Sequence, residues 1–470
     1  MTRSEAEQKQ FIRMTETPVP RLITSLAIPT IFTMLIGAFY NMADTFFVAR
    51  LGTSAAGAVG IVFAIMAIIQ ALGFMIGIGT GSHVSRFLGR QNREEADKFA
   101  STGFFLSLLF GGILTAIGLL FTEPLMILLG ATPTILPYAR DYAGCIFMGA
   151  VVMCGSIVMN NILRSEGKAV LSTIGLGFGG ILNVGLDPLF IFQFGLGISG
   201  AAIATLISQC VSFGILLYWF STGKSITRLS WSNLSRKGAD YADILKLGFS
   251  SFCRQGLAGI STVALNVSAA AYGDSAVAAM SIVGRIFYFL LAMLIGFGQG
   301  FQPVVGYNYG AKRFERVKES FRFCVKTGTV FLTGVGILGF LFAPQLIQLF
   351  KVNDPSVAAI GAMAFRAQCI ALPLQATIVL SNMLFQSSGK ALQATRISAT
   401  RQGIYFIPLI LILPRYFGLT GIEFTQSISD LFSFLSALPF LYFFFRSLNR
   451  AMRERVPAGE EETPCGQMAA

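Results

Sequence analysis

The chain has 470 residues, of which 54% are hydrophobic and only 12% are charged, and its net charge is +12. A soluble domain carries about 25% charged residues, so this composition excludes an ordinary soluble protein. A charge of this sign also fits a nucleic-acid-binding protein, but its distribution along the chain indicates a membrane topology instead.

Twelve long apolar segments follow one another, and each is long enough to cross a bilayer as a helix. The sequence therefore predicts an all-α integral membrane protein with spans at residues 21–48, 54–80, 100–121, 136–163, 169–194, 199–220, 244–271, 276–304, 320–343, 357–385, 393–414 and 421–445. The first segment contains Asp44 and is too long for a cleavable signal peptide. The predicted organisation is an N-terminal tail (1–20), a six-helix lobe (21–220), a linker (221–246), a second six-helix lobe (247–446) and a C-terminal tail (447–470).

The second six spans repeat the first six at an offset of about 221 residues. Gly77 falls on Gly298 in this register, and Gly197-Ile198-Ser199-Gly200 falls on Gly418-Leu419-Thr420-Gly421. Because six is an even number, each lobe starts and ends on the same side, so the two repeats are parallel and pseudo-symmetric. Such a pair of lobes suits transport by alternating access, with the substrate site between them.

Positive charge is distributed unevenly between the two sides of the predicted topology. Most of the 35 Lys and Arg lie in the two tails and in the loops that follow even-numbered spans, whereas the opposite loops hold only Arg50, Arg140, Lys351 and Arg415. Loops rich in Lys and Arg stay in the cytoplasm, which places both termini there. We expect a multi-pass protein of the cell inner or plasma membrane that contacts lipid and binds no nucleic acid.

Two acids within the spans are the main candidates for chemistry, because charge in a bilayer is costly. Asp44 lies roughly 9 Å from the outer end of the first span, and Asp187 lies roughly 12 Å from the outer end of the fifth. Thr205 lies at a similar depth in the sixth span, and Asn183 shares a helix face with Asp187 at spacing i, i+4. These groups predict a cation-coupling site for H⁺ or Na⁺, with Pro29 as a hinge in the first helix.

The second lobe lacks equivalent acids, so the coupling chemistry is predicted to be asymmetric. The sequence leaves open whether Glu423 and Asp430 in the last span have a function or pair with neighbouring helices, and the same holds for Arg254 and Arg285. A lone His83 and seven cysteines without a CxxC pair make an enzyme or a metal centre an unfavourable interpretation. We expect no cofactor, and no metal beyond Na⁺ at the coupling site.

The residues around Asp44 carry a family resemblance. The stretch Asn41-Met42-Ala43-Asp44-Thr45-Phe46-Phe47-Val48-Ala49-Arg50-Leu51-Gly52 resembles the first-helix signature of the multidrug and toxic compound extrusion (MATE) family. The loops 164–168 and 386–390 are also similar to that family. The resemblance implies two six-helix lobes and cation-coupled export of lipophilic, often cationic compounds.

Within that family, the chain is similar to the branch that keeps its coupling acids in the first lobe. The matching positions are Pro29, Tyr40, Asp44, Tyr142, Asn160, Asn183, Asp187 and Thr205. The resemblance thus adds Tyr40, Tyr142 and Asn160 as supporting residues. We expect a monomeric antiporter of small drug-like molecules. The alternative is a flippase for lipids or lipid-linked oligosaccharides of the same wider superfamily, which a strongly basic cleft would favour.

Overall fold

The computed structural model describes residues 3–350 and 354–454, and the regular elements in these ranges are all helices. The first half of the chain contains α1 (Arg3–Glu16), α2 (Val19–Ala49), α3 (Thr53–Gly89), α4 (Arg93–Leu120), α5 (Thr122–Leu128), α6 (Leu136–Ser165), α7 (Ala169–Pro188), the π-helical turn η1 (Leu189–Gln193) and α8 (Gly197–Ser221). A single 3₁₀ turn, η2 (Trp231–Asn233), lies between the halves.

The second half has the same order of long helices. It contains α9 (Gly238–Ala270), α10 (Asp274–Gly310), α11 (Phe314–Leu341), α12 (Ala343–Gln348), α13 (Pro355–Ala371), α14 (Leu374–Ser387), α15 (Ala391–Ala399), the π-helical segment η3 (Thr400–Tyr405) and α16 (Phe406–Arg453). Helices dominate because a spanning segment has no water to satisfy its backbone polar groups and must satisfy them internally.

The helices account for twelve membrane spans within the described residues. Nine helical runs are long and apolar enough to cross a bilayer, and α13 with α14 forms a further span bent by 56°. The run Ala391–Arg453 is counted once, although at 63 residues it is long enough for two spans. α9 has 33 residues but is more polar, since it carries Arg254 and Gln255. The expectation of an all-α, twelve-helix membrane protein in two lobes is confirmed.

Two predicted boundaries differ from the structure. The predicted span 357–385 is broken between α13 and α14, where Pro373 lacks the backbone N–H of a continuous helix. The predicted loop between 414 and 421 is instead a kink in α16, where Gly418 adopts φ 60° and ψ −139°. Glycine tolerates such a conformation because it has no Cβ, so the chain reverses there with almost no loop.

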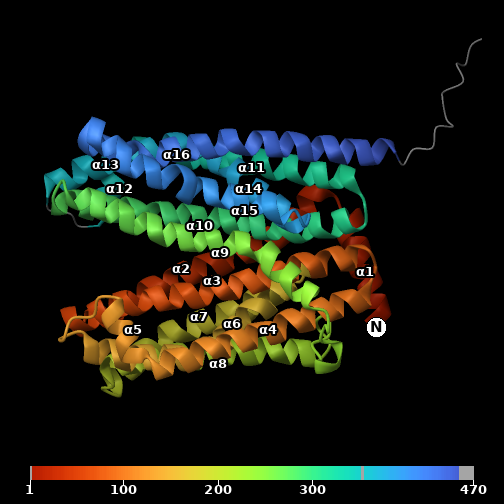
Figure 1. The fold of residues 1–470 in the computed structure, drawn as a ribbon, viewed down its shortest axis with the longest axis horizontal. Helices are drawn as coiled ribbons and strands as arrows, with labels where there is room; N and C mark the ends of the chain where they lie inside the picture. The colour runs from red at the N-terminus through yellow and green to blue at the C-terminus, as the bar shows by residue number, and fades with distance from the viewer. Residues whose placement is uncertain (1–2, 351–353, 455–470) are drawn as a thin grey trace, which may run out of the picture.

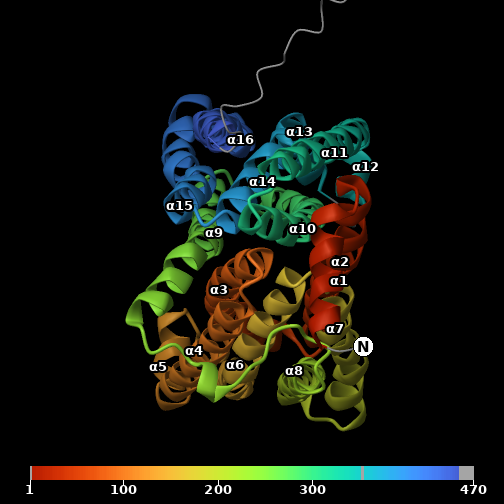
Figure 2. The same ribbon diagram turned by 90° about the vertical axis from the view of Figure 1, so that its right-hand side faces the viewer.

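The two lobes lie one above the other in Figure 1, with α2–α8 below and α9–α16 above. Figure 2 gives the view turned by 90° and shows α2, α3, α9 and α10 along the boundary between the lobes. The closest approaches use glycine: a Cβ on Gly248 of α9 would lie 1.7 Å from the Met75 carbonyl oxygen of α3, and one on Gly300 of α10 would lie 2.5 Å from the Ala27 Cα of α2. These contacts lie in the half of the bundle nearer to α1, which we call the α1 end.

α1 forms a bridge across the lobes at this end (Figure 1). Toward the first lobe, Glu7 pairs with Arg93 of α4 at 3.3 Å. Toward the second lobe, the Asn308 side chain of α10 donates to the Met14 carbonyl at 3.0 Å, and Arg313 donates to the Thr15 carbonyl at 2.8 Å. The sequence predicted only a polar tail over residues 1–20, so this helix is a feature that the tertiary structure adds.

The stretch predicted as a linker, 221–246, is fastened to the first lobe and includes the start of α9. The Arg228 backbone N–H donates to Asp97 at 2.8 Å, and the Ser101 hydroxyl donates to the Arg228 carbonyl at 3.0 Å. Further on, the Ser235 backbone N–H donates to the Thr102 hydroxyl at 3.0 Å. At the other terminus, α16 continues to Arg453, and the predicted tail from 455 to 470 lies outside the described residues.

Candidate cation-coupling site in the first lobe

Asp44 and Tyr142 meet inside the first lobe. Asp44 lies near the end of α2, and the Tyr142 hydroxyl of α6 donates to its Oδ2 atom at 3.1 Å. Tyr142 is fully buried and Asp44 is 7% exposed. The phenol therefore contacts the carboxylate directly, and it does not act as an anchor at the membrane surface.

Asp187, Asn183 and Thr205 form the second part of the site. The Asn183 side-chain N–H₂ donates to Asp187 Oδ1 at 3.2 Å and to the Thr205 hydroxyl at 3.1 Å. The spacing i, i+4 puts the first two on one face of α7, and Thr205 comes from the facing helix α8. All three are buried. The wider π-helical turn η1 begins two residues after Asp187, and such turns are frequent at functional sites.

Three oxygen atoms of this cluster have no hydrogen-bond partner in the described part of the chain. They are Asp44 Oδ1, Asp187 Oδ2 and Asn183 Oδ1, and all are buried. Asp44 lies within electrostatic range of Asp187. A buried acceptor without a donor is costly, and two buried carboxylates that are both ionised also repel each other. A proton or a small hard cation removes both penalties, because either one supplies what the free oxygens lack.

Tyr40 lies one helical turn before Asp44 on α2, within electrostatic range of both acids. Asn160 belongs elsewhere: it lies 18 residues beyond Tyr142 on α6, roughly 27 Å along the helix. Its side chain donates to the Ser172 carbonyl of α7 at 2.8 Å. The structure thus brings Tyr40 to the acids but places Asn160 in a contact between two helices.

Pro29 lies 15 residues before Asp44, inside a helix that continues through it. Its carbonyl accepts from the Thr173 hydroxyl of α7 at 2.8 Å and from the Thr33 hydroxyl at 3.1 Å. The next residue, Thr30, donates to the Gly296 carbonyl of α10 at 2.6 Å. The predicted hinge therefore lies where α2 is bonded to both lobes.

The second lobe contains a polar cluster whose pairing the sequence did not show. Asp430 of α16 is 1% exposed and pairs with Arg401 of η3 at 2.9 Å, and Gln426 donates to the same carboxylate at 2.9 Å. Gln426 stands 221 residues after Thr205, so the pair occupies the repeat position of the first-lobe site. A permanent guanidinium there neutralises the acid, which removes the need for an ion. No group of three His, Cys, Asp or Glu suited to a metal occurs among the described residues.

The duplicated lobes and the acid cluster match a known family. The family model MatE matches residues 29–189 and 255–412, one segment in each lobe and together more than half of the chain. The chain belongs to the MatE family. Its match in two segments agrees with the internal repeat seen in the sequence.

Curated members of this family are similar along nearly the whole chain. The multidrug export protein MepA of Staphylococcus saprophyticus is 28% identical over 417 residues, which cover 88% of this chain and 92% of that protein. MepA of Staphylococcus aureus is 24% identical over 437 residues, which cover 93% and 96% respectively.

Solved MATE structures have the same fold. A MATE transporter in complex with MaL6 superposes with a TM-score of 0.89 at 26% identity, covering 94% of this chain and 99% of that one. A transporter of the MOP superfamily from Pyrococcus furiosus, described as having a binding pocket of reversed polarity, gives 0.88 at 27% identity over 94% and 99%. An outward-facing multidrug resistance MATE transporter gives 0.88 at 26% identity over 93% and 98%. The expectations of a multi-pass membrane transporter and of a protein that is no enzyme are confirmed.

Proposed function

We propose that this MatE protein exports small, lipophilic and often cationic molecules, and that H⁺ or Na⁺ entering the cell through the first-lobe cluster drives the export. The main support is the set of three buried, unpartnered oxygens on Asp44, Asp187 and Asn183. Export is also the printed role of the MepA relatives. The protein would act as a monomer in contact with lipid.

The coupling ion must bind the two transport states with different affinity, since only that difference can shift their populations. α2 links the ion site to the lobe boundary, because it carries Asp44 near one end and contacts α10 near the other. A Cβ on Gly296 of α10 would lie 2.6 Å from the Ile31 Cα, so α2 cannot bend there without moving α10. Loading the acids would thereby change the contacts that hold the lobes together.

The positive-inside distribution supports a cytoplasmic location for the α1 end. The close contacts of α9 with α3, and of α10 with α2, lie toward this end. The state described would then be closed toward the cytoplasm, which agrees with the similarity to an outward-facing transporter. In this state the acids would receive ions from outside and the drug would leave.

The alternative function, a flippase for lipids or lipid-linked sugars, has one observation in its favour. Arg254 is half-buried in α9 and belongs to no ion pair among the described residues. A cation between the lobes can attract phosphate head groups. The buried acids of the first lobe favour drug export.

The test is dye efflux from cells or inverted vesicles, with the H⁺ and Na⁺ gradients collapsed separately. We expect Asp44→Asn and Asp187→Asn to bind a cationic dye and fail to transport it. Asp141→Asn is the matched control, because Asp141 is exposed and lies next to Tyr142 on α6. The gradient whose collapse stops efflux identifies the ion. Efflux by both variants at the control rate would refute the coupling role of these acids.

A further inference from the structure

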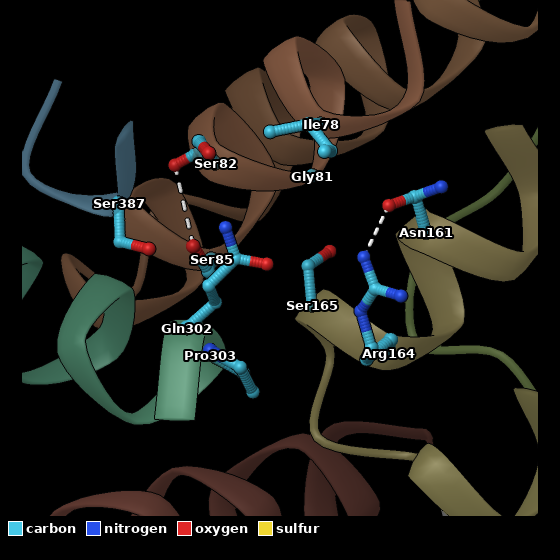
Figure 3. A pocket seen from close by; sticks show the side chains of 10 residues that line it. All are labelled: Ile78, Gly81, Ser82, Ser85, Asn161, Arg164, Ser165, Gln302, Pro303 and Ser387. Atoms are coloured by element: carbon cyan, nitrogen blue, oxygen red, sulfur yellow. Dashed lines mark hydrogen bonds between the residues drawn. The ribbon is translucent and has the colours of Figure 1, made fainter. Parts of the chain in front are cut away.

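A small polar pocket lies between the lobes near the α1 end (Figure 3). It is lined by α3 and α6 of the first lobe and by α10 and α14 of the second. The polar side chains at its wall are Ser82, Ser85, Asn161, Arg164, Ser165, Gln302 and Ser387. No carboxylate lines it, and the accessible space suits one water-sized particle, far less than a drug molecule needs.

Arg164 brings a positive charge to this pocket without an acidic partner. Its side chain is 4% exposed, and it donates to Gln299 Oε1 of the second lobe at 2.7 Å and to Asn161 Oδ1. Both acceptors are neutral, and no carboxylate lies within ion-pair distance of Arg164 in the described part of the chain. The other buried arginine of the lobes, Arg401, contacts Asp430 at 2.9 Å. A buried charge without a counter-charge is unfavourable, and the negative end of the α6 dipole offsets only part of that cost.

Two hydroxyl groups in the wall have no hydrogen bond in the part of the chain that the structure describes. They belong to Ser82 of the first lobe and Ser387 of the second. The neighbouring hydroxyls of Ser85 and Ser165 already donate to carbonyls of their own helices. The pocket thus offers one cation and two free donors, whereas a metal cation would find no anionic ligand. This chemistry selects a small anion.

We propose that a monatomic anion, chloride under ordinary conditions, binds in this pocket and accepts hydrogen bonds from Arg164, Ser82 and Ser387. Because the donors come from both lobes, the bound anion stabilises the arrangement in which the α1 end is closed. Separation of the lobes at this end dismantles the site and releases the anion. Chloride therefore shifts the population toward the closed α1 end by its preferential binding to that state.

The test measures thermal unfolding of the purified protein while chloride is replaced stepwise by gluconate at constant ionic strength. We expect the Tm to rise with chloride, bromide to replace chloride, and sulfate to have no effect because it is too large for the pocket. Ser82→Ala with Ser387→Ala keeps the charge and removes two donors, so the half-saturating chloride concentration should rise about tenfold or more. Arg164→Gln should abolish the dependence.

The matched control is Arg366→Gln, which removes an equal charge from α13 at the opposite end of the bundle. Arg366 donates to the Phe340 carbonyl and does not line the pocket, so this variant should keep the full chloride response. A Tm that follows ionic strength alone, or an unchanged response in the double serine variant, would overturn the proposal and leave only an ordered water in the pocket. If Arg164→Gln fails to fold, the serine variant and anomalous diffraction from bromide still decide between the two outcomes.

Discussion

Glu166 is the buried carboxylate that attaches the linker to the first lobe. It lies between α6 and α7, is fully buried, and accepts four hydrogen bonds from the linker. Its Oε1 accepts from the Ser225 hydroxyl at 2.7 Å, the Thr227 N–H at 2.9 Å and the Thr227 hydroxyl at 2.7 Å. Its Oε2 accepts from the Ile226 N–H at 2.8 Å. The change Glu166→Gln keeps the shape and tests these bonds.

The substitution removes the charge and turns one acceptor into a donor that faces the Ile226 N–H. Hydrogen bonds to charged groups contribute about 1.5–3 kcal/mol each against about 1 kcal/mol for neutral ones, and an unsatisfied buried donor costs about 1–3 kcal/mol. The three weakened bonds and the one lost bond together lower the free energy of linker opening by about 3–5 kcal/mol. Since about 1.4 kcal/mol is a factor of ten, the open population should rise at least about a hundredfold.

Limited trypsin digestion in detergent measures this opening. The linker contains Lys224, Arg228, Arg236 and Lys237, and cleavage there follows the population of the open form when reclosing is fast. Glu123→Gln is the control, since that carboxylate is exposed and lies 3.9 Å from Arg140. Equal cleavage rates for the two variants would refute the reasoning, because the four bonds would then contribute nothing to holding the linker.

Gly248→Ala should lower the Tm by several degrees, because its Cβ would clash with the Met75 carbonyl; Gly259→Ala on the same helix meets nothing within 4 Å and should leave the Tm unchanged or slightly higher. Arg401→Met should destabilise the protein by about 3–5 kcal/mol by leaving Asp430 unpaired, whereas adding Asp430→Leu should restore most of the stability; chemical denaturation measures both, and no recovery in the double variant contradicts the ion-pair explanation. Removing α1 should make cysteine probes at the lobe boundary more reactive, because bonds to both lobes are lost, and unchanged labelling would contradict its bridging role.

Several features were predictable because their signals are local. Apolar runs of spanning length mark the helices, since hydrocarbon leaves an unpaired backbone no alternative partner. The spacing of Asn183 and Asp187 placed them on one face, and the depths of Asp44 and Thr205 brought these residues to the same level. The reverse turn at Gly418 was expected as a short loop, because neither length nor composition distinguishes a loop from a single strained glycine.

The contacts that set the pairing of charges were not predictable, because their partners are far apart in sequence. The linker donors of Glu166 lie about 60 residues away, and Asp430 lies 29 residues from Arg401. The same holds for the contact of Tyr142 with Asp44, which only the resemblance to a family suggested and which spans 98 residues. The sequence by itself determined the membrane class, the duplication and the acids of one lobe, since apolarity, repetition and charge are properties of single positions. Only the tertiary structure decided which acids keep free oxygens and which have a built-in cation, because that depends on how the helices are oriented against one another.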